Sequence, residues 1–165
     1  MTTKQLSMID YRPQPSPLIG EIKALYERMQ DENKANGTRA QIHGPQDAVY
    51  LFAPNLLDKD QEELWVMCLD TRNHVLELRQ IYRGSLNQSQ IRISEVLRPA
   101  VVLNAASIII AHNHPSGDPT PSPDDVTVTR AILEACKLFN IKLLDHVIIG
   151  NDGRFTSLKD RNLLD

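Results

Sequence analysis

The chain has 165 residues, of which 41% are hydrophobic and 24% charged, and its formal net charge is −3. This composition is typical of one globular domain with a single core, and the slight acidity does not suggest a nucleic-acid or anionic membrane partner. We expect neither a membrane span nor a signal peptide, because no apolar run has the required length or position. Cys68 and Cys136 lie far apart inside apolar runs, so we expect buried, reduced thiols in a cytoplasmic protein.

The first part of the chain is predicted to be an extension that contains one amphipathic helix. A proline-rich lead, "YRPQPSP", ends at Ser16-Pro17, which is a favourable helix start. Apolar residues then recur at helical spacing from Leu18 to Met29, and Asn36-Gly37 stops the pattern. We therefore assign residues 1–41 to an N-terminal extension and residues 42–165 to the main domain.

The main domain is predicted to alternate between helices and strands. The predicted helices span residues 45–57, 94–105 and 124–140. The predicted strands span residues 64–70, 75–84, 107–112, 141–150 and 154–158, with a hairpin turn at 71–73. In the second helix, Ser94 is a candidate cap, and Pro99 should remove a backbone hydrogen bond or delay the helix start. This alternation predicts an α/β or α+β fold with a mixed sheet.

Two histidines stand one residue apart at the end of a buried strand, in "SIIIAHNHPSG". Residues two apart in a strand point to the same face, so His112 and His114 should present both imidazoles together. They lie at the C-terminal end of the strand, where open α/β sheets place ligands. Two imidazoles are half of a zinc site, but a pair of loop histidines bonded to backbone is also consistent with this pattern.

Asp125 is the candidate for a third ligand. It opens the predicted helix after a loop stiffened by three alternating prolines, which can direct its carboxylate back toward the histidines. Ser122 and Asp125 also form an S-x-x-D capping box, and both roles can hold at once because a helix start fixes the carboxylate in place. Two histidines and one aspartate would leave an open position on a zinc ion, which is typical of a catalytic site.

The spacing of His112, His114, Ser122 and Asp125 matches the JAMM metalloprotease signature. With "YRGSLN", "LNAASIIIAHNHPSGDPTPS" and "LLDHVIIG", residues 42–164 resemble the RadC-type branch of the JAB/MPN superfamily. The resemblance implies a curved mixed sheet flanked by helices, of cytidine-deaminase-like architecture, with one Zn²⁺ at its edge. The sequence reads "IRISEV" where the family is closer to "VHPREV", and the helix-hairpin-helix region of RadC-type proteins is not expected here.

The resemblance also implies a glutamate upstream of the histidines that acts as general base. Glu62 and Glu63 are the candidates, and strand alternation allows only one of them to face the site. RadC-type sequences place a large apolar residue two positions after this glutamate, and Leu64 in that position selects Glu62. The alternative for either glutamate is a solvated acid. The implied reaction is hydrolysis of an amide or isopeptide bond, in which the Ser122 hydroxyl stabilises the oxyanion.

His146, beside Asp145, is interpreted as a satisfied core histidine, with the alternative that the carboxylate orients it near a metal ligand. A zinc deaminase would need H-x-E and P-C-x-x-C, and the sequence has neither. The competing function is a DNA-repair-associated or other binding module that keeps the fold without hydrolysis, although no basic cluster indicates direct DNA contact. The expected partner is a peptide or an isopeptide-linked protein, and the oligomeric state is left open.

Overall fold

A computed structural model describes residues 37–84 and 91–164, together with isolated positions between residues 20 and 35. Those isolated positions are helical and exposed. The apolar stripe predicted between Leu18 and Met29 lies outside the described residues. The division of the chain at residue 41 therefore stays a prediction.

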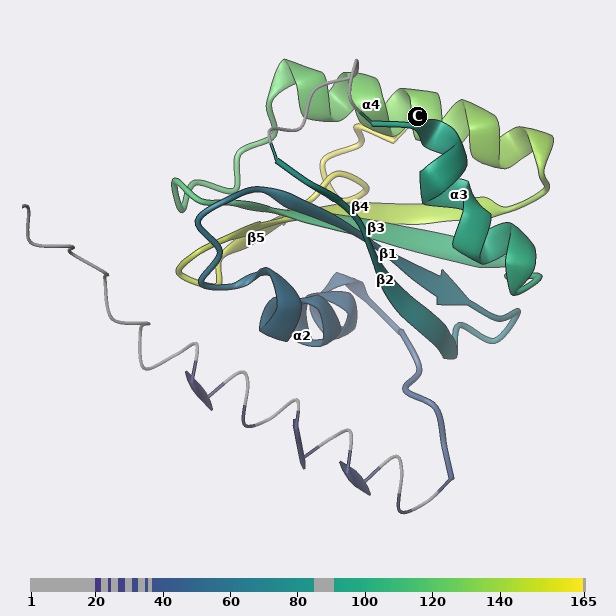
Figure 1. Ribbon diagram of the computed structural model, residues 1–165, viewed down its shortest axis with the longest axis horizontal. Helices are drawn as coiled ribbons and strands as arrows, with labels where there is room; N and C mark the ends of the chain where they lie inside the picture. The colour runs from purple at the N-terminus through teal and green to yellow at the C-terminus, as the bar shows by residue number, and fades with distance from the viewer. Residues whose placement is uncertain are drawn as a thin grey trace, which may run out of the picture.

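Within the described residues, five strands form one mixed sheet in the order β2-β1-β3-β4-β5 (Figure 1). They are β1 (Glu63–Leu69), β2 (Val75–Arg83), β3 (Ser107–His114), β4 (Lys142–Gly150) and β5 (Phe155–Ser157). Strands β3 and β4 pair in parallel, whereas the other neighbours pair antiparallel. A parallel pair needs a long crossover connection, and α4 (Pro123–Leu138) supplies it. The predicted mixed sheet is confirmed.

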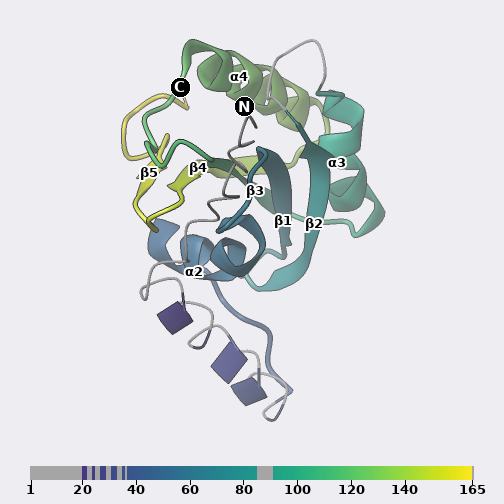
Figure 2. The same cartoon turned by 60° about the vertical axis from the view of Figure 1, so that its left-hand side comes forward.

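Helices cover both faces of this sheet (Figure 2). On one face, α2 (Pro45–Leu56) packs its Phe52 in a buried cluster with Met67 of β1. On the opposite face, α3 (Ile93–Val102) and α4 form a second buried cluster, which includes Ile132. Because side chains alternate along a strand, neighbouring residues of β1 and β3 enter two different environments.

Several element ends differ from the predicted ones. The predicted cap at Ser94 is wrong, because α3 starts earlier: the backbone N–H of Glu95 already donates to the carbonyl of Arg92, which holds the N-cap position. Pro99 lies inside α3 and does not delay its start. Strand β3 continues through His114, two residues beyond its predicted end, because its last residues pair with β4.

Both cysteines are buried and free, as predicted. Burial raises the pKa of the Cys68 and Cys136 thiols to about 11. The thiolate is the reactive form of cysteine, so these two side chains behave as inert core residues near neutral pH.

Candidate metal centre

The C-terminal end of β3 and the first turn of α4 bring His112, His114 and Asp125 together. The Nε2 atoms of the two histidines are 3.0 Å apart. The Nε2 atom of His112 is 3.2 Å from Oδ1 of Asp125, and the Nε2 atom of His114 is 3.4 Å from Oδ2. We call these three residues the His-His-Asp cluster. The loop after β3 therefore returns the carboxylate to the histidines, as the sequence suggested.

The start of α4 holds the carboxylate of Asp125 in place. Ser122 is the N-cap, and its Oγ accepts a hydrogen bond from the Asp125 N–H at 3.1 Å. In return, Oδ2 of Asp125 accepts a hydrogen bond from the Ser122 N–H at 2.7 Å. The capping box and the cluster thus share one carboxylate, and the role of Asp125 as a metal ligand stays a prediction.

The donor set and its spacing fit a zinc ion. In a tetrahedral site with bonds of about 2.0–2.2 Å, neighbouring ligand atoms are about 3.3–3.6 Å apart. In the His-His-Asp cluster the two Nε2 atoms are 3.0 Å apart and lie 3.2 and 3.4 Å from two different oxygens of Asp125. With one ligand atom taken from each residue, all three atoms lie within 4.8 Å of one another, so the cluster is compact enough to hold an ion. Two imidazoles and one carboxylate are common zinc ligands, and three protein ligands leave a fourth position for a reacting group.

Each candidate histidine ligand is oriented through its Nδ1 atom. The Nδ1 atom of His114 is 2.7 Å from the carbonyl oxygen of Asp118, which can only accept, so Nδ1 carries the hydrogen and donates it. The Nδ1 atom of His112 is 2.7 Å from Nε2 of His146. Histidines that bind metals are usually held in this way by the nitrogen that faces away from the ion.

Charge interactions within the cluster are strong. Burial alone would raise the pKa of Asp125, but its contacts with His112 and His114, whose protonated forms can donate from Nε2, outweigh burial and hold this pKa well below its usual range. The pKa of His114 is raised above 6.5, first by its hydrogen bond to Asp125 and against the opposing effect of burial. The carboxylate is therefore ionised at neutral pH and attracts a cation to the cluster.

Glu62 immediately precedes β1 and belongs to the same face of the sheet as the cluster. Leu64 pairs with His112 across β1 and β3, and alternation places Glu62 on the side of Leu64. Glu62 is half-buried. The raised pKa of His114, caused first by Asp125, also has a contribution from the charge of Glu62, so this carboxylate lies within electrostatic reach of the cluster. The role of Glu62 as general base stays a prediction.

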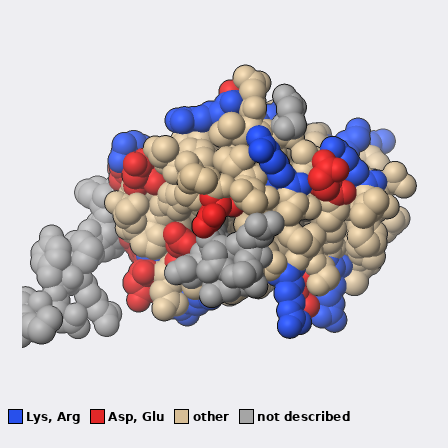
Figure 3. All heavy atoms as spheres, turned by 90° about the horizontal axis from the view of Figure 1, so that it is seen from above, with Lys and Arg blue, Asp and Glu red and all other residues tan. Residues whose placement is uncertain are grey.

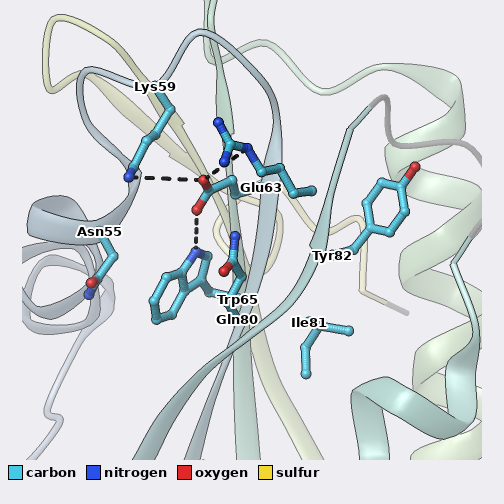
Figure 4. A pocket seen from close by; sticks show the side chains of 8 residues that line it. Asn55, Lys59, Glu63, Trp65, Gln80, Ile81 and Tyr82 are labelled. Carbon is cyan, nitrogen blue, oxygen red and sulfur yellow. Dashed lines mark hydrogen bonds and ion pairs between the residues drawn. The ribbon is translucent and has the colours of Figure 1, made fainter.

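Glu63 lies on the opposite face, in a hollow between β1, β2 and the end of α2 (Figure 4). Its carboxylate is only 4% exposed and accepts a hydrogen bond from Nε1 of Trp65 at 3.0 Å. The charged nitrogens of Lys59 and Arg83 are 3.9 and 3.8 Å from its Oε1. Glu63 is therefore an interior acid held by its neighbours, and its interpretation as a solvated acid is wrong.

Asn113, which stands between the two histidines, holds the backbone on both sides of Glu62. Its side chain is fully buried on the face opposite the histidines. Its Oδ1 accepts from the Glu63 N–H at 2.8 Å, and its Nδ2 donates to the Gln61 carbonyl at 3.0 Å. Sequence reasoning did not identify this role. The only signal was an amide in a strand otherwise rich in apolar residues, since a buried amide needs partners.

His146 was also only partly understood from sequence. It is a buried, hydrogen-bonded histidine as predicted, but its Nε2 contacts His112. Its Nδ1 is 2.5 Å from Oγ1 of Thr129, which donates to the carbonyl of Asp125. Burial, followed by the charge of His112, lowers the pKa of His146 well below 6.5. The carboxylate of Asp145 accepts from the backbone N–H of His146, so orientation of the ring by this carboxylate is not observed.

Basic and acidic side chains are interspersed over the face seen from above in Figure 3. This mixed pattern agrees with the small net charge of −3. Among the described residues on that face, no continuous basic surface of the kind that nucleic acids require is seen. In the part of the chain that the structure describes, none of the helices has the length and apolar character needed to cross a bilayer.

A mixed sheet flanked by helices, with the His-His-Asp cluster at the end of a strand, defines a JAB-like fold with a candidate metal centre. The family model of the RadC-like JAB domain matches residues 42–163, and the chain belongs to this family. It is 53% identical over 125 residues to the UPF0758 protein of Roseiflexus castenholzii, and this aligned region covers 76% of this chain and 53% of that protein. It is 47% identical over 127 residues to the UPF0758 protein of Moorella thermoacetica, and this aligned region covers 77% of this chain and 55% of that protein. The chain thus spans about half the length of the curated relatives it matches.

Proposed function

We propose that this chain is a zinc-dependent hydrolase of the JAMM type that cleaves an amide or isopeptide bond in a peptide or protein substrate. The observation that carries the proposal is the convergence of three metal-binding side chains, whose ligand atoms all lie within 4.8 Å of one another. The position of Glu62 on the same face supports a catalytic rather than a purely structural site. Membership of the RadC-like JAB domain family supports the hydrolase class.

In this proposal, His112, His114 and Asp125 hold the zinc ion, which when bound supplies a Lewis acid for the scissile carbonyl and lowers the pKa of the attacking water. Glu62 accepts the proton of that water and returns it to the leaving amine. A carboxylate suits both steps because it alternates between base and acid within one turnover.

Ser122 is proposed to stabilise the negative oxygen that develops on the substrate carbonyl. Its Oγ already accepts a hydrogen bond from the Asp125 N–H, which leaves its O–H to donate to an oxyanion. Ser122 is half-buried at the N-terminus of α4, where the helix dipole also favours negative charge.

The proposed partner is a peptide or an isopeptide-linked protein, and neither DNA nor a membrane is proposed as one. We propose a cytoplasmic location, which the two free, buried thiols support because reducing compartments keep cysteines unpaired.

Metal analysis of the purified chain tests the proposal. We expect one zinc ion per chain in the wild type and none in His114→Ala. His43→Ala is the matched control, because His43 is exposed and its side chain pairs with Asp47, outside the cluster. Full zinc occupancy in His114→Ala, measured by elemental analysis, would overturn the assignment of the ligands.

Hydrolysis is tested separately with a panel of peptide and isopeptide substrates. We expect the zinc-loaded wild type to cleave members of the panel. A chain that binds stoichiometric zinc and cleaves none of them would favour the non-catalytic binding module.

A further inference from the structure

We infer that His146 and Thr129 are positioning residues that fix the tautomer of His112, so that the Nε2 lone pair of His112 faces the His-His-Asp cluster. This inference rests on the metal site of the proposed function. A series of buried hydrogen bonds supports it. This hydrogen-bond chain begins at one candidate ligand, His112, and ends at the backbone carbonyl of another, Asp125.

Three different elements supply this chain. His112 lies in β3, His146 in β4 and Thr129 in α4. The distances are 2.7 Å from His112 Nδ1 to His146 Nε2, 2.5 Å from His146 Nδ1 to Thr129 Oγ1, and 2.5 Å from Thr129 Oγ1 to the Asp125 carbonyl oxygen. The exposed fractions of the three side-chain partners are 0%, 1% and 0%. In such an environment a polar group that loses its partner is costly, so each bond constrains the next.

The direction of every bond follows from the last member of the chain. The Asp125 carbonyl can only accept, so the single hydroxyl hydrogen of Thr129 is donated to it. Thr129 Oγ1 must then accept from His146 Nδ1–H, and a neutral imidazole protonated on Nδ1 accepts at Nε2. The Nδ1 atom of His112 therefore carries a hydrogen and donates it to His146. The Nε2 atom of His112 is left with its lone pair, directed at His114 and Asp125.

The two candidate histidine ligands reach the same tautomer by different means. His114 donates from Nδ1 to the backbone carbonyl of Asp118, which no side-chain substitution removes. His112 is oriented by the side chains of His146 and Thr129, so its tautomer can be altered by substitution while every candidate ligand is kept. His146 and Thr129 touch neither the nucleophile nor the substrate in this scheme; both act through His112, and Thr129 also holds the backbone carbonyl of Asp125.

This series of hydrogen bonds also connects candidate ligands that come from different elements. Thr129 bonds to the carbonyl one turn earlier in α4, and that carbonyl belongs to Asp125. A break at Thr129 should therefore loosen both the ring of His112 and the first turn of α4. Loss of groups that orient metal ligands typically weakens metal affinity by about 10- to 100-fold.

Thr129→Val and Thr129→Ser, made in the full chain, form a matched pair. Valine nearly preserves the shape of threonine but removes the hydroxyl, whereas serine retains it. Two measurements are needed: zinc affinity by competition with a chromogenic chelator, and the His112 tautomer by NMR of the ¹⁵N-histidine-labelled, metal-free chain. We expect the wild type and Thr129→Ser to hold the hydrogen on Nδ1. Thr129→Val should show mixed tautomers and bind zinc about 10- to 100-fold more weakly.

A second pair of variants covers the case in which Thr129→Val fails to fold. His146→Gln offers an amide oxygen that can accept from His112 Nδ1, whereas His146→Leu offers none, so the glutamine variant should bind zinc more tightly. The inference is overturned if Thr129→Val folds and retains both the wild-type affinity and the Nδ1–H tautomer, or if the glutamine and leucine variants bind zinc equally. If the wild type takes up no zinc, the proposed function fails, and the NMR measurement still decides whether this chain sets the tautomer of His112.

Discussion

Two adjacent glutamates at the start of β1 occupy opposite faces of the sheet and have different surroundings. Glu63 is almost completely buried, and the indole of Trp65 donates to it while Lys59 and Arg83 lie near its charge. Glu62 is half-buried, and its charge reaches the His-His-Asp cluster on the other face. Neighbouring positions at the start of one strand thus differ in role. The carboxylate of Glu63 is paired with side chains of the protein interior, whereas Glu62 lies on the side of the candidate metal centre.

The comparison shows that burial alone does not identify a functional acid. Glu63 is the more buried of the two, yet its neighbours belong to the chain itself and leave it a structural role. Asn113 connects the two environments, because it bonds to the backbone on both sides of Glu62 from the face that Glu63 occupies. The candidate base is therefore held in place from the opposite face of the sheet.

The largest expected effect comes from exchanging each glutamate for glutamine in turn. Glu62→Gln keeps the shape but cannot accept the proton, so it should retain zinc and lose about 10²–10⁴ in turnover on any cleaved member of the substrate panel. Glu63→Gln should turn over at a rate close to that of the wild type. Loss of activity in Glu63→Gln with an active Glu62→Gln would reverse the comparison.

Asn113→Ala should show whether the position of Glu62 affects turnover independently of zinc binding. The variant removes both bonds that hold the backbone around Glu62, and small misplacements of a catalytic group can cost up to about 10²-fold in rate. We expect zinc stoichiometry to be kept while turnover falls. Asn113→Asp is the intermediate control, since it can still accept from the Glu63 N–H but cannot donate to the Gln61 carbonyl. Unchanged turnover in Asn113→Ala would show that these bonds do not position the base.

On the opposite face, Glu63→Ala should affect stability rather than catalysis. It leaves the N–H of the half-buried Trp65 without its acceptor, and an unsatisfied buried donor typically costs about 1–3 kcal/mol in the free energy of unfolding. Glu63→Gln keeps an acceptor oxygen and should cost less. Urea unfolding of the three proteins measures both values. An alanine variant as stable as the wild type would mean that the indole finds another partner.

The smallest expected effect is a pH dependence of stability in the metal-free chain. The folded-state pKa of His114 is raised above 6.5, so its stabilisation is complete below pH 6.5 and is lost as pH rises through the raised value. After removal of metal with a chelator, the free energy of unfolding should therefore decline as pH increases above 6.5. Asp125→Asn should flatten this decline, because the hydrogen bond to the carboxylate is its main cause. A wild-type curve that rises over this range would contradict the assignment.

Local rules were sufficient to predict the candidate ligands. Strand alternation placed His112 and His114 on one face, and the capping pattern placed Asp125 at a helix start that the structure confirms. Alternation reduced the choice between Glu62 and Glu63 to one of two faces, and the resemblance to RadC-type sequences, with Leu64 in the large apolar position, selected Glu62. Helix ends were predicted less well: the N-cap of α3 is Arg92 rather than Ser94, because a helix can begin two residues earlier with little change in sequence pattern.

The sequence by itself therefore determined which residue types stand at the cluster, because alternation and capping act over a few neighbouring positions. Only the tertiary structure decided which buried residues contact the candidate ligands and the backbone around the candidate base. His146 is 34 residues from His112, and Asn113 is 50 residues from Glu63, so these contacts depend on the pairing of distant strands. The register of β4 beside β3, with its irregularity between Ile108 and Ile109, decides which side chain reaches His112. Register is set by packing of the whole sheet between its two helical layers, and no short stretch of sequence contains that information.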